Sequence, residues 1–276
     1  MLNWWYSLVD LLLPFTWTES TFMKNALLAI LLVTPLFGLL GTMVVSNRMA
    51  FFSDSIGHGA FTGIAFGTIF AGIRPIWGAI IFSLVFAVAI TLIKQRSKAS
   101  SDTVIGVFSS TAVAVGLIIL SFSGSFSSFS NFLIGDLLYI DQMDLLLLAL
   151  VFLGVIALWV LILNKILLVS ISESLAASRG VNTFLTEVLF TCAIALVVTI
   201  TIQWVGLLLI NSLLVLPAAA ARNISKNVRQ YHFVSVAISL FAGVTGLILS
   251  YAFNVSTGAS IVLVAAVLFF ISLARR

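Results

Sequence analysis

The chain has 276 residues, of which 62% are hydrophobic and only 8% are charged. Water-soluble domains carry about 25% charged residues, so this composition excludes an ordinary soluble protein. A membrane-spanning helix needs about 20 mostly apolar residues, which allows about ten crossings at most. We therefore predict an all-α polytopic membrane protein with little mass outside the bilayer.

Residues 1–24 are predicted to form an external or interfacial segment, followed by a single transmembrane domain over residues 25–276. No Lys or Arg precedes Lys24, which argues against the basic start of a cleaved signal peptide. Aromatic rings with a polar edge favour the membrane interface. The segment carries four of them: Trp4, Trp5, Tyr6 and Trp17.

Stretches without Asp, Glu, Lys or Arg mark the candidate spans. They cover residues 25–47, 55–73, 75–93, 103–135, 145–164, 188–221 and 230–274. The stretch 103–135 should cross once and end near Ser121, because Ser and Gly residues typical of a loop follow. A short surface helix is expected over residues 131–140.

The stretch 188–221 is too long for one crossing and short for two. We predict two short or broken helices, with a turn at Gln203 and Trp204 and a kink at Pro217, which lacks a backbone donor. The last stretch should divide at residues 253–258, where turn-forming residues gather. About nine spans result, with eight as the lower count.

Basic residues test the orientation, because cytoplasmic loops are enriched in Lys and Arg. With nine spans, only Lys24 and Arg74 of the 13 basic residues lie on one side. The other eleven are Arg48, Lys94, Arg96, Lys98, Lys165, Arg179, Arg222, Lys226, Arg229, Arg275 and Arg276. The asymmetry predicts an external N-terminus and a cytoplasmic C-terminus. It also accounts for the net charge of +4 without nucleic acid as a partner.

Asp54 and His58 form the most informative polar pair. A spacing of four residues places both on one helix face, and carboxylate with imidazole suits zinc, manganese or iron(II). Ionisable groups within a span are costly and usually face a pathway. On the other interpretation, Ser53 or Asp54 caps the helix and His58 bonds a neighbouring helix. Spacing by itself leaves both open.

Glycines follow this pair at intervals of four residues, at Gly59, Gly63 and Gly67. Small residues in such a stripe let two helix backbones approach closely. We therefore predict close helix packing here, which is compatible with a narrow ion path.

Two further polar residues are candidates for the same path. Glu187 begins one predicted span and Asn211 lies in the broken one, so either could complete a coordination shell. A Glu at a helix start is also favourable for the helix dipole alone, and we favour that interpretation for Glu187. An acidic cluster on the external side, Asp136, Asp141 and Asp144, is explained most simply as a solvated loop.

The segment 172–180 has helix signals at both ends, with Ser172 as an N-cap and Gly180 as a stop. It is predicted to be a two-turn cytoplasmic helix that either docks into a soluble partner or rests at the lipid surface. Its candidate contact residues are Ser172, Glu173, Leu175, Ala176, Ala177, Arg179 and Gly180.

Motifs for chemistry within the chain are absent from the sequence. There is no G-x-x-x-x-G-K-[ST] for ATP and no H-E-x-x-H for a zinc protease. The single cysteine, Cys192, forms neither a disulfide nor a thiolate cluster within one chain. With only two histidines, a hydrolytic centre is disfavoured, and we predict that the chain is not an enzyme.

Several segments, in order, resemble the permease subunits of bacterial ABC importers for zinc, manganese and iron. The matching pieces are residues 48–58 (RMAFFSDSIGH), 105–110 (IGVFSS), 172–181, 205–222 and 256–263 (STGASIVL). They cover most of the chain after residue 24.

The resemblance implies a multi-pass permease of the bacterial cytoplasmic membrane that works as a pair, such as a homodimer. Two cytoplasmic ABC ATPases that bind ATP would drive it, and an external binding protein would deliver zinc or manganese. It also implies that Asp54 and His58 line the metal path and that residues 172–180 are the coupling helix. The alternative is a secondary transporter or channel for cations, which needs no ATPase but typically carries more intramembrane carboxylates.

Overall fold

The computed structural model describes residues 3–12, 18–70, 74–123, 135 and 140–274. All regular structure in these residues is helical. The helices are α1 (Asn3–Leu12), α2 (Thr21–Ser46), α3 (Phe52–Phe70), α4 (Pro75–Arg96), α5 (Ser101–Ser123), α7 (Gln142–Ile171), α8 (Glu173–Ser178), α9 (Thr183–Val205), α10 (Leu207–Ile224), α11 (Val228–Phe253) and α12 (Thr257–Ala274). The surface helix predicted over residues 131–140 falls almost entirely outside the described residues.

Seven of the described helices are long and apolar enough to cross a membrane, namely α2, α4, α5, α7, α9, α11 and α12. The predicted polytopic all-α fold is therefore confirmed. Two further helices, α3 with 19 residues and α10 with 18, coincide with the remaining predicted spans. The predicted break over residues 253–258 is also confirmed, because α11 ends at Phe253 and α12 begins at Thr257.

The stretch 188–221 forms two helices, as predicted. The chain turns at Gly206, where φ is +86°, a backbone conformation that glycine adopts without steric cost. This turn lies just after the predicted position at Gln203 and Trp204. The first of the two helices is not short, because α9 starts at Thr183, where the Asn182 side chain caps it by accepting from the Leu185 amide at 2.9 Å. Pro217 lies inside α10.

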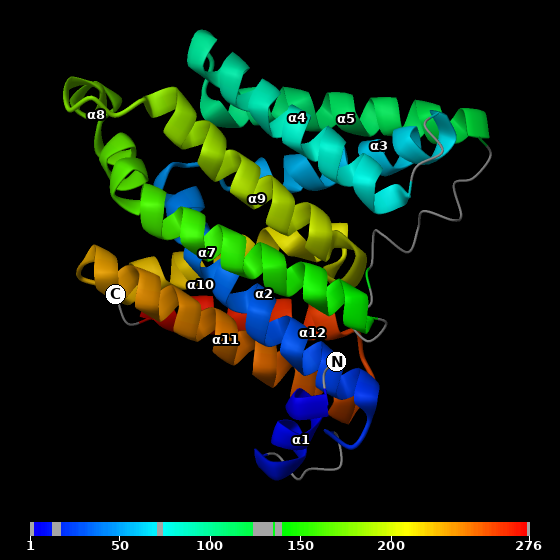
Figure 1. The fold of residues 1–276 in the computed structure, drawn as a ribbon. Helices are drawn as coiled ribbons and strands as arrows, with labels where there is room; N and C mark the ends of the chain where they lie inside the picture. Colours follow the sequence, from blue (N-terminus) through cyan, green and yellow to red (C-terminus); the bar gives the residue numbers. More distant parts are fainter. Residues whose placement is uncertain (1–2, 13–17, 71–73, 124–134, 136–139, 275–276) are drawn as a thin grey trace.

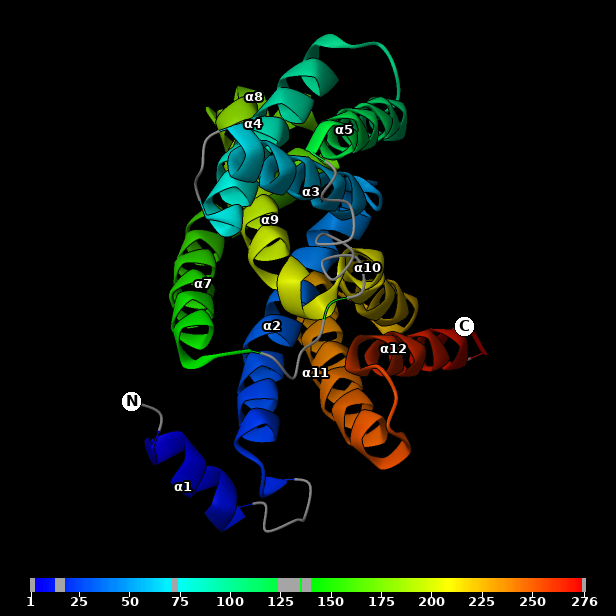
Figure 2. The same cartoon turned by 90° about the vertical axis from the view of Figure 1, so that its right-hand side faces the viewer.

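The helices pack around α2 and α9, the two most buried spans. Figures 1 and 2 both show α9 between α4 and α7, while α2 runs beside α11. Helices α3, α4 and α5 pack together as one group, and α2, α10, α11 and α12 as another, so that α9 joins the two groups. Figure 2 shows α5, α10 and α12 on the flank away from α7.

Small and hydroxylic residues let these helices approach closely. Ser235 and Ser239 of α11 donate to the carbonyl oxygens of Gly38 and Thr34 of α2, at 2.6 and 2.7 Å. Lipid tails are as apolar as the helix surfaces, so the hydrophobic effect does not drive helices together in a membrane. Interhelical hydrogen bonds and close packing hold them together instead.

The predicted glycine stripe of α3 does serve close packing. A Cβ atom on Gly63 would lie 2.6 Å from the carbonyl oxygen of Gly78 in α4 and 2.5 Å from Phe82 Cβ. On Gly59 it would lie 2.8 Å from a ring carbon of Phe86. The α3–α4 contact therefore requires glycine at Gly63, where backbone lies in the way, whereas at Gly59 the Phe86 ring would have to shift.

Helix α1 is attached to the start of α2 by polar contacts. The Trp5 Nε1 group donates to the Lys24 carbonyl oxygen at 2.9 Å, and the Tyr6 hydroxyl donates to Asn25 Oδ1 at 2.8 Å. Lys24 is buried and its Nζ lies 2.6 Å from Asp10 Oδ1. These contacts fix the N-terminal segment against the transmembrane domain, because a buried ammonium needs a paired carboxylate.

Candidate metal path and coupling surface

The Asp54–His58 pair lies on the first two turns of α3. His58 Nε2 is 3.6 Å from Asp54 Oδ2, so the four-residue spacing does bring the two side chains together. The His58 side chain remains 26% exposed and the Asp54 side chain 38% exposed. Their neighbours Ser53, Ser55 and Ile56 are fully buried. The pair therefore lies on the one face of α3 that the single chain leaves uncovered.

Asn211 contacts Ser53, the residue that precedes Asp54 in the sequence. Its Oδ1 accepts a hydrogen bond from Ser53 Oγ at 2.8 Å. The contact is possible because α10 starts against α3: a Cβ on Gly57 would lie 2.2 Å from Leu207 Cδ1. Asn211 thus packs against the buried side of α3 through Ser53, and among the described contacts its side chain is not bonded to Asp54 or His58.

Glu187 lies elsewhere, in an ion pair with Lys94 at the last turn of α4. Gln95 Nε2 adds a contact to Glu187 Oε2 at 3.4 Å. Both charged side chains are largely buried, with 18% of Lys94 and 10% of Glu187 exposed. Glu187 is therefore engaged by an ammonium group, and the structure gives it a role in packing α9 against α4.

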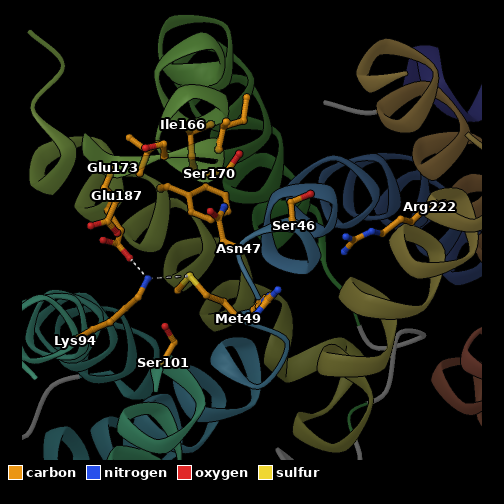
Figure 3. A pocket seen from close by; sticks show the side chains of 15 residues that line it. Ser46, Asn47, Met49, Lys94, Ser101, Ile166, Ser170, Glu173, Glu187 and Arg222 are labelled. Carbon is orange, nitrogen blue, oxygen red and sulfur yellow. Dashed lines mark hydrogen bonds and ion pairs between the residues drawn. The ribbon is translucent and has the colours of Figure 1, made fainter. Parts of the chain in front are cut away.

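A cavity of about 460 Å³ opens beside this ion pair. It is bordered by the α2–α3 turn, the ends of α4, α7 and α10, and the starts of α8 and α9. Figure 3 shows Lys94 pointing into it towards Glu187 and Met49. Arg48 in the turn has φ +55° and also lines the cavity, together with Glu173 and Arg222. The cavity therefore separates the start of α8 from the turn that leads into α3.

We expect Glu187→Gln to lower the thermal stability of the purified protein, because it leaves the Lys94 ammonium buried without its counter-charge. Breaking a fully buried pair costs about 3–5 kcal/mol, and water in the cavity should reduce this to about 1–3 kcal/mol. The melting temperature measured in detergent should fall by several degrees. The matched control is Glu173→Gln, an exposed carboxylate on the same cavity, which should leave it unchanged. If Lys94→Met with Glu187→Leu fails to recover the lost stability, the loss has another cause.

The segment 172–180 folds as predicted, with helix α8 between Ser172 and Arg179. Ser172 Oγ accepts from the Leu175 amide at 3.3 Å, and Gly180 has φ +74°. Ala176 is fully buried and faces the rest of the chain, whereas Leu175 is 42% exposed. The remaining residues of this set, Glu173, Ala177, Arg179 and Gly180, are exposed. A partner that docks here would therefore meet Leu175 and its neighbours, and Ala176 holds the helix in place.

The Asp54–His58 pair provides only part of a metal coordination shell. Within the part of the chain that the structure describes, no group of three or more His, Cys, Asp or Glu side chains could hold a metal. Asp54 and His58 supply two ligands, and divalent metals in proteins take four or more. Among the described residues, further ligands would be amide or hydroxyl oxygens, with water or another chain as the other sources.

Sequence reasoning missed two contributors to these sites. Lys94 counts in the sequence only as a cytoplasmic charge, although it directly follows the charge-free stretch 75–93 and lies two residues before the end of α4, from where a long side chain can reach back into the bundle. Ser53 was considered only as a helix cap, and no pattern in the sequence pairs it with Asn211, 158 residues away.

Known proteins resemble the chain over nearly its whole length. It is 32% identical over 251 residues to the manganese import system permease protein ScaB of Streptococcus gordonii, with 91% of this chain and 90% of the relative covered. It is 29% identical over 252 residues to the high-affinity zinc uptake system membrane protein ZnuB of Haemophilus influenzae, with 91% and 96% covered.

A solved structure agrees with these sequence relationships. The fold is similar to PsaBC from Streptococcus pneumoniae in complex with Fab, with a TM-score of 0.81 and 31% identity over 97% of this chain and 94% of that one. The sequence model of the ABC 3 transport family (ABC-3) matches residues 19–276, which include every helix after α1. The chain therefore belongs to the ABC 3 transport family.

Proposed function

We propose that the chain is the membrane permease of an ATP-driven importer of divalent metal ions, with zinc or manganese as the cargo. The Asp54–His58 pair carries this proposal, because an acid and an imidazole are held 3.6 Å apart on an uncovered face of a charge-poor bundle. Relatives named for manganese import and zinc uptake support it. ATP would be bound by a separate ABC ATPase, and an external binding protein would deliver the metal.

Nine crossings fit this proposal, with α3 and α10 added to the seven longer spans. The N-terminus would then be external and the C-terminus cytoplasmic, with α8 facing the ATPase. Eleven of the 13 basic residues fall on the side of α8 in this arrangement, as expected for cytoplasmic loops.

A second copy of the permease would cover the exposed face of the metal pair. Partly exposed ionisable groups in a span do not face lipid without a large cost. Helix α5, which packs against α3, has an exposed stripe of Gly106, Ser110 and Ala114 at four-residue spacing. A Cβ on Gly106 would meet nothing within 4 Å, so this face is open to another helix. Two copies meeting here would bring two Asp54–His58 pairs, and so four ligands, to one path.

Cysteine cross-linking tests this pairing. In a Cys192→Ser background, we expect Ser110→Cys to form a disulfide-linked dimer on mild oxidation in membranes, because the two α5 helices would face each other. Val160→Cys is the matched control, since Val160 is 72% exposed on α7, on the opposite flank (Figure 2). Cross-linking that is equal at both positions, or confined to Val160, would contradict pairing through α5.

Reconstitution tests the function as a whole. The permease is placed in liposomes with or without its ATPase, and uptake of radioactive zinc or manganese is measured with the metal-loaded binding protein outside. We expect uptake only when ATPase and ATP are both present. Uptake by the permease alone, driven by an ion gradient, would instead assign it to secondary transporters or channels. The ratio of zinc to manganese rates identifies the cargo.

A further inference from the structure

A second cavity lies at the other end of the bundle, away from α8. It has a volume of about 500 Å³, within the range of about 300–1,000 Å³ common for ligand sites. Its walls are the starts of α4 and α7, and its floor is the end of α9, which packs against both. Figures 1 and 2 show this order of the three helices.

Polar groups gather at the mouth of this groove because three helices end there. Arg74 precedes α4, Asp144 is in the first turn of α7, and Gln203 and Trp204 are in the last turn of α9. Arg74 is exposed, and its side chain has no hydrogen bond or ion pair with any residue that the structure describes. Asp144 lines the same groove without being within ion-pair distance of Arg74, so an unpaired cation and a carboxylate face one space.

Below the mouth the groove becomes aliphatic. Leu147 and Leu150 continue along α7, and the buried Ile200 forms the floor. From Asp144 to Leu150 the groove descends about 9 Å along the helix, at about 1.5 Å per residue. Trp77 and Trp204 also line the groove, and indole rings favour the membrane interface.

We propose that this groove binds one membrane phospholipid with an amine headgroup, such as phosphatidylethanolamine. The Arg74 guanidinium binds the phosphate, for which its planar fork of donors is suited. The Asp144 carboxylate accepts from the headgroup ammonium, and one acyl chain lies along Leu147, Leu150 and Ile200. A soluble protein would not follow a groove that descends between membrane-spanning helices.

The occupancy of the groove is independent of the metal path, so it can be tested without transport. The full permease–ATPase complex is purified, stripped of lipid and incubated with phosphatidylethanolamine, phosphatidylcholine or phosphatidylglycerol of equal chain length. Retained lipid is counted by native mass spectrometry. We expect phosphatidylethanolamine to be retained about tenfold more tightly than the other two, because only it offers both a phosphate and N–H donors.

Single substitutions test the phosphate contact and the ammonium contact of the headgroup one at a time. Arg74→Gln should weaken retention of all three lipids about tenfold. Asp144→Asn should remove only the preference for the amine headgroup. The helix start should be kept in this variant, because the Asn side chain can still accept the hydrogen bond that the Asp141 amide donates to Asp144. Leu147→Trp should fill the groove and abolish retention. Two controls should retain lipid as the wild type does: Lys98→Gln, a charge change at the other end, and Leu153→Trp, a 64% exposed position on α7 outside the groove.

Three results would overturn the proposal. The first is equal retention of the three lipids by the wild-type complex, and the second is wild-type retention by Arg74→Gln. The third is a loss of retention in the controls as large as in the groove variants, which would indicate unspecific surrounding lipid. If Arg74→Gln keeps its lipid but loses affinity for the external binding protein, the groove belongs to a protein interface instead.

Discussion

Asp54→Asn and His58→Ala are each expected to reduce metal uptake by about tenfold or more, and the double variant should abolish it. Loss of a hydrogen-bond partner of a metal ligand already costs about 10–100-fold in affinity, and loss of a ligand should cost at least as much. The measurement is ATP-dependent zinc or manganese uptake into liposomes that contain the permease and its ATPase.

The matched control for this pair is Asp102→Asn. Asp102 is an exposed carboxylate in the first turn of the neighbouring helix α5. It forms no ion pair with any residue that the structure describes. Its replacement should leave uptake unchanged. All variants should still co-purify with the ATPase, because neither Asp54 nor His58 belongs to α8 or lines the cavity beside it. Normal uptake by the Asp54→Asn/His58→Ala double variant would remove the pair from the metal path.

Leu175→Asp is expected to weaken binding of the ATPase by about thirtyfold or more, and to stop uptake with it. Leu175 is the exposed apolar residue of α8, and a central apolar contact of this kind is worth about 2 kcal/mol or more in an interface. Introducing a carboxylate there also adds a desolvation cost to the complex. The affinity is measured by titrating the purified ATPase onto the permease in detergent.

A position outside α8 serves as the control for this substitution. Val228 is 46% exposed at the first residue of α11, where a new carboxylate is favourable for the helix dipole, so Val228→Asp should bind the ATPase normally. Ala176 is a poorer probe than its sequence position suggested: it is fully buried, so a bulky residue there would displace α8 from α7 and α9 and mix folding with docking. Unchanged affinity in Leu175→Asp would exclude α8 as the coupling surface.

Local patterns in the sequence were enough to predict most of the helices. Charge-free stretches of about 20 residues have to be spans, since hydrocarbon leaves the backbone no other way to satisfy its hydrogen bonds. The division of the last stretch, the end of α5 near Ser121 and the short helix after Ser172 were predicted correctly from turn, loop and cap residues, whose effect on the backbone is local. The pairing of Asp54 with His58 was predictable as well, because a four-residue spacing on a helix leaves the two side chains little choice.

Relations between distant segments were decided by the tertiary structure alone. Whether Glu187 joined the metal pair or Lys94 depended on which helix ends meet, and the structure joins it to Lys94, 93 residues away. The link between Ser53 and Asn211 likewise arises because α3 packs against α10, and the groove that gathers Arg74 and Asp144 arises because α4 and α7 both pack against α9. Helix periodicity fixes which side chains share a face, but in a membrane every span is apolar on most of its surface. Only the packing of small residues and buried polar groups therefore selects the partner of each face.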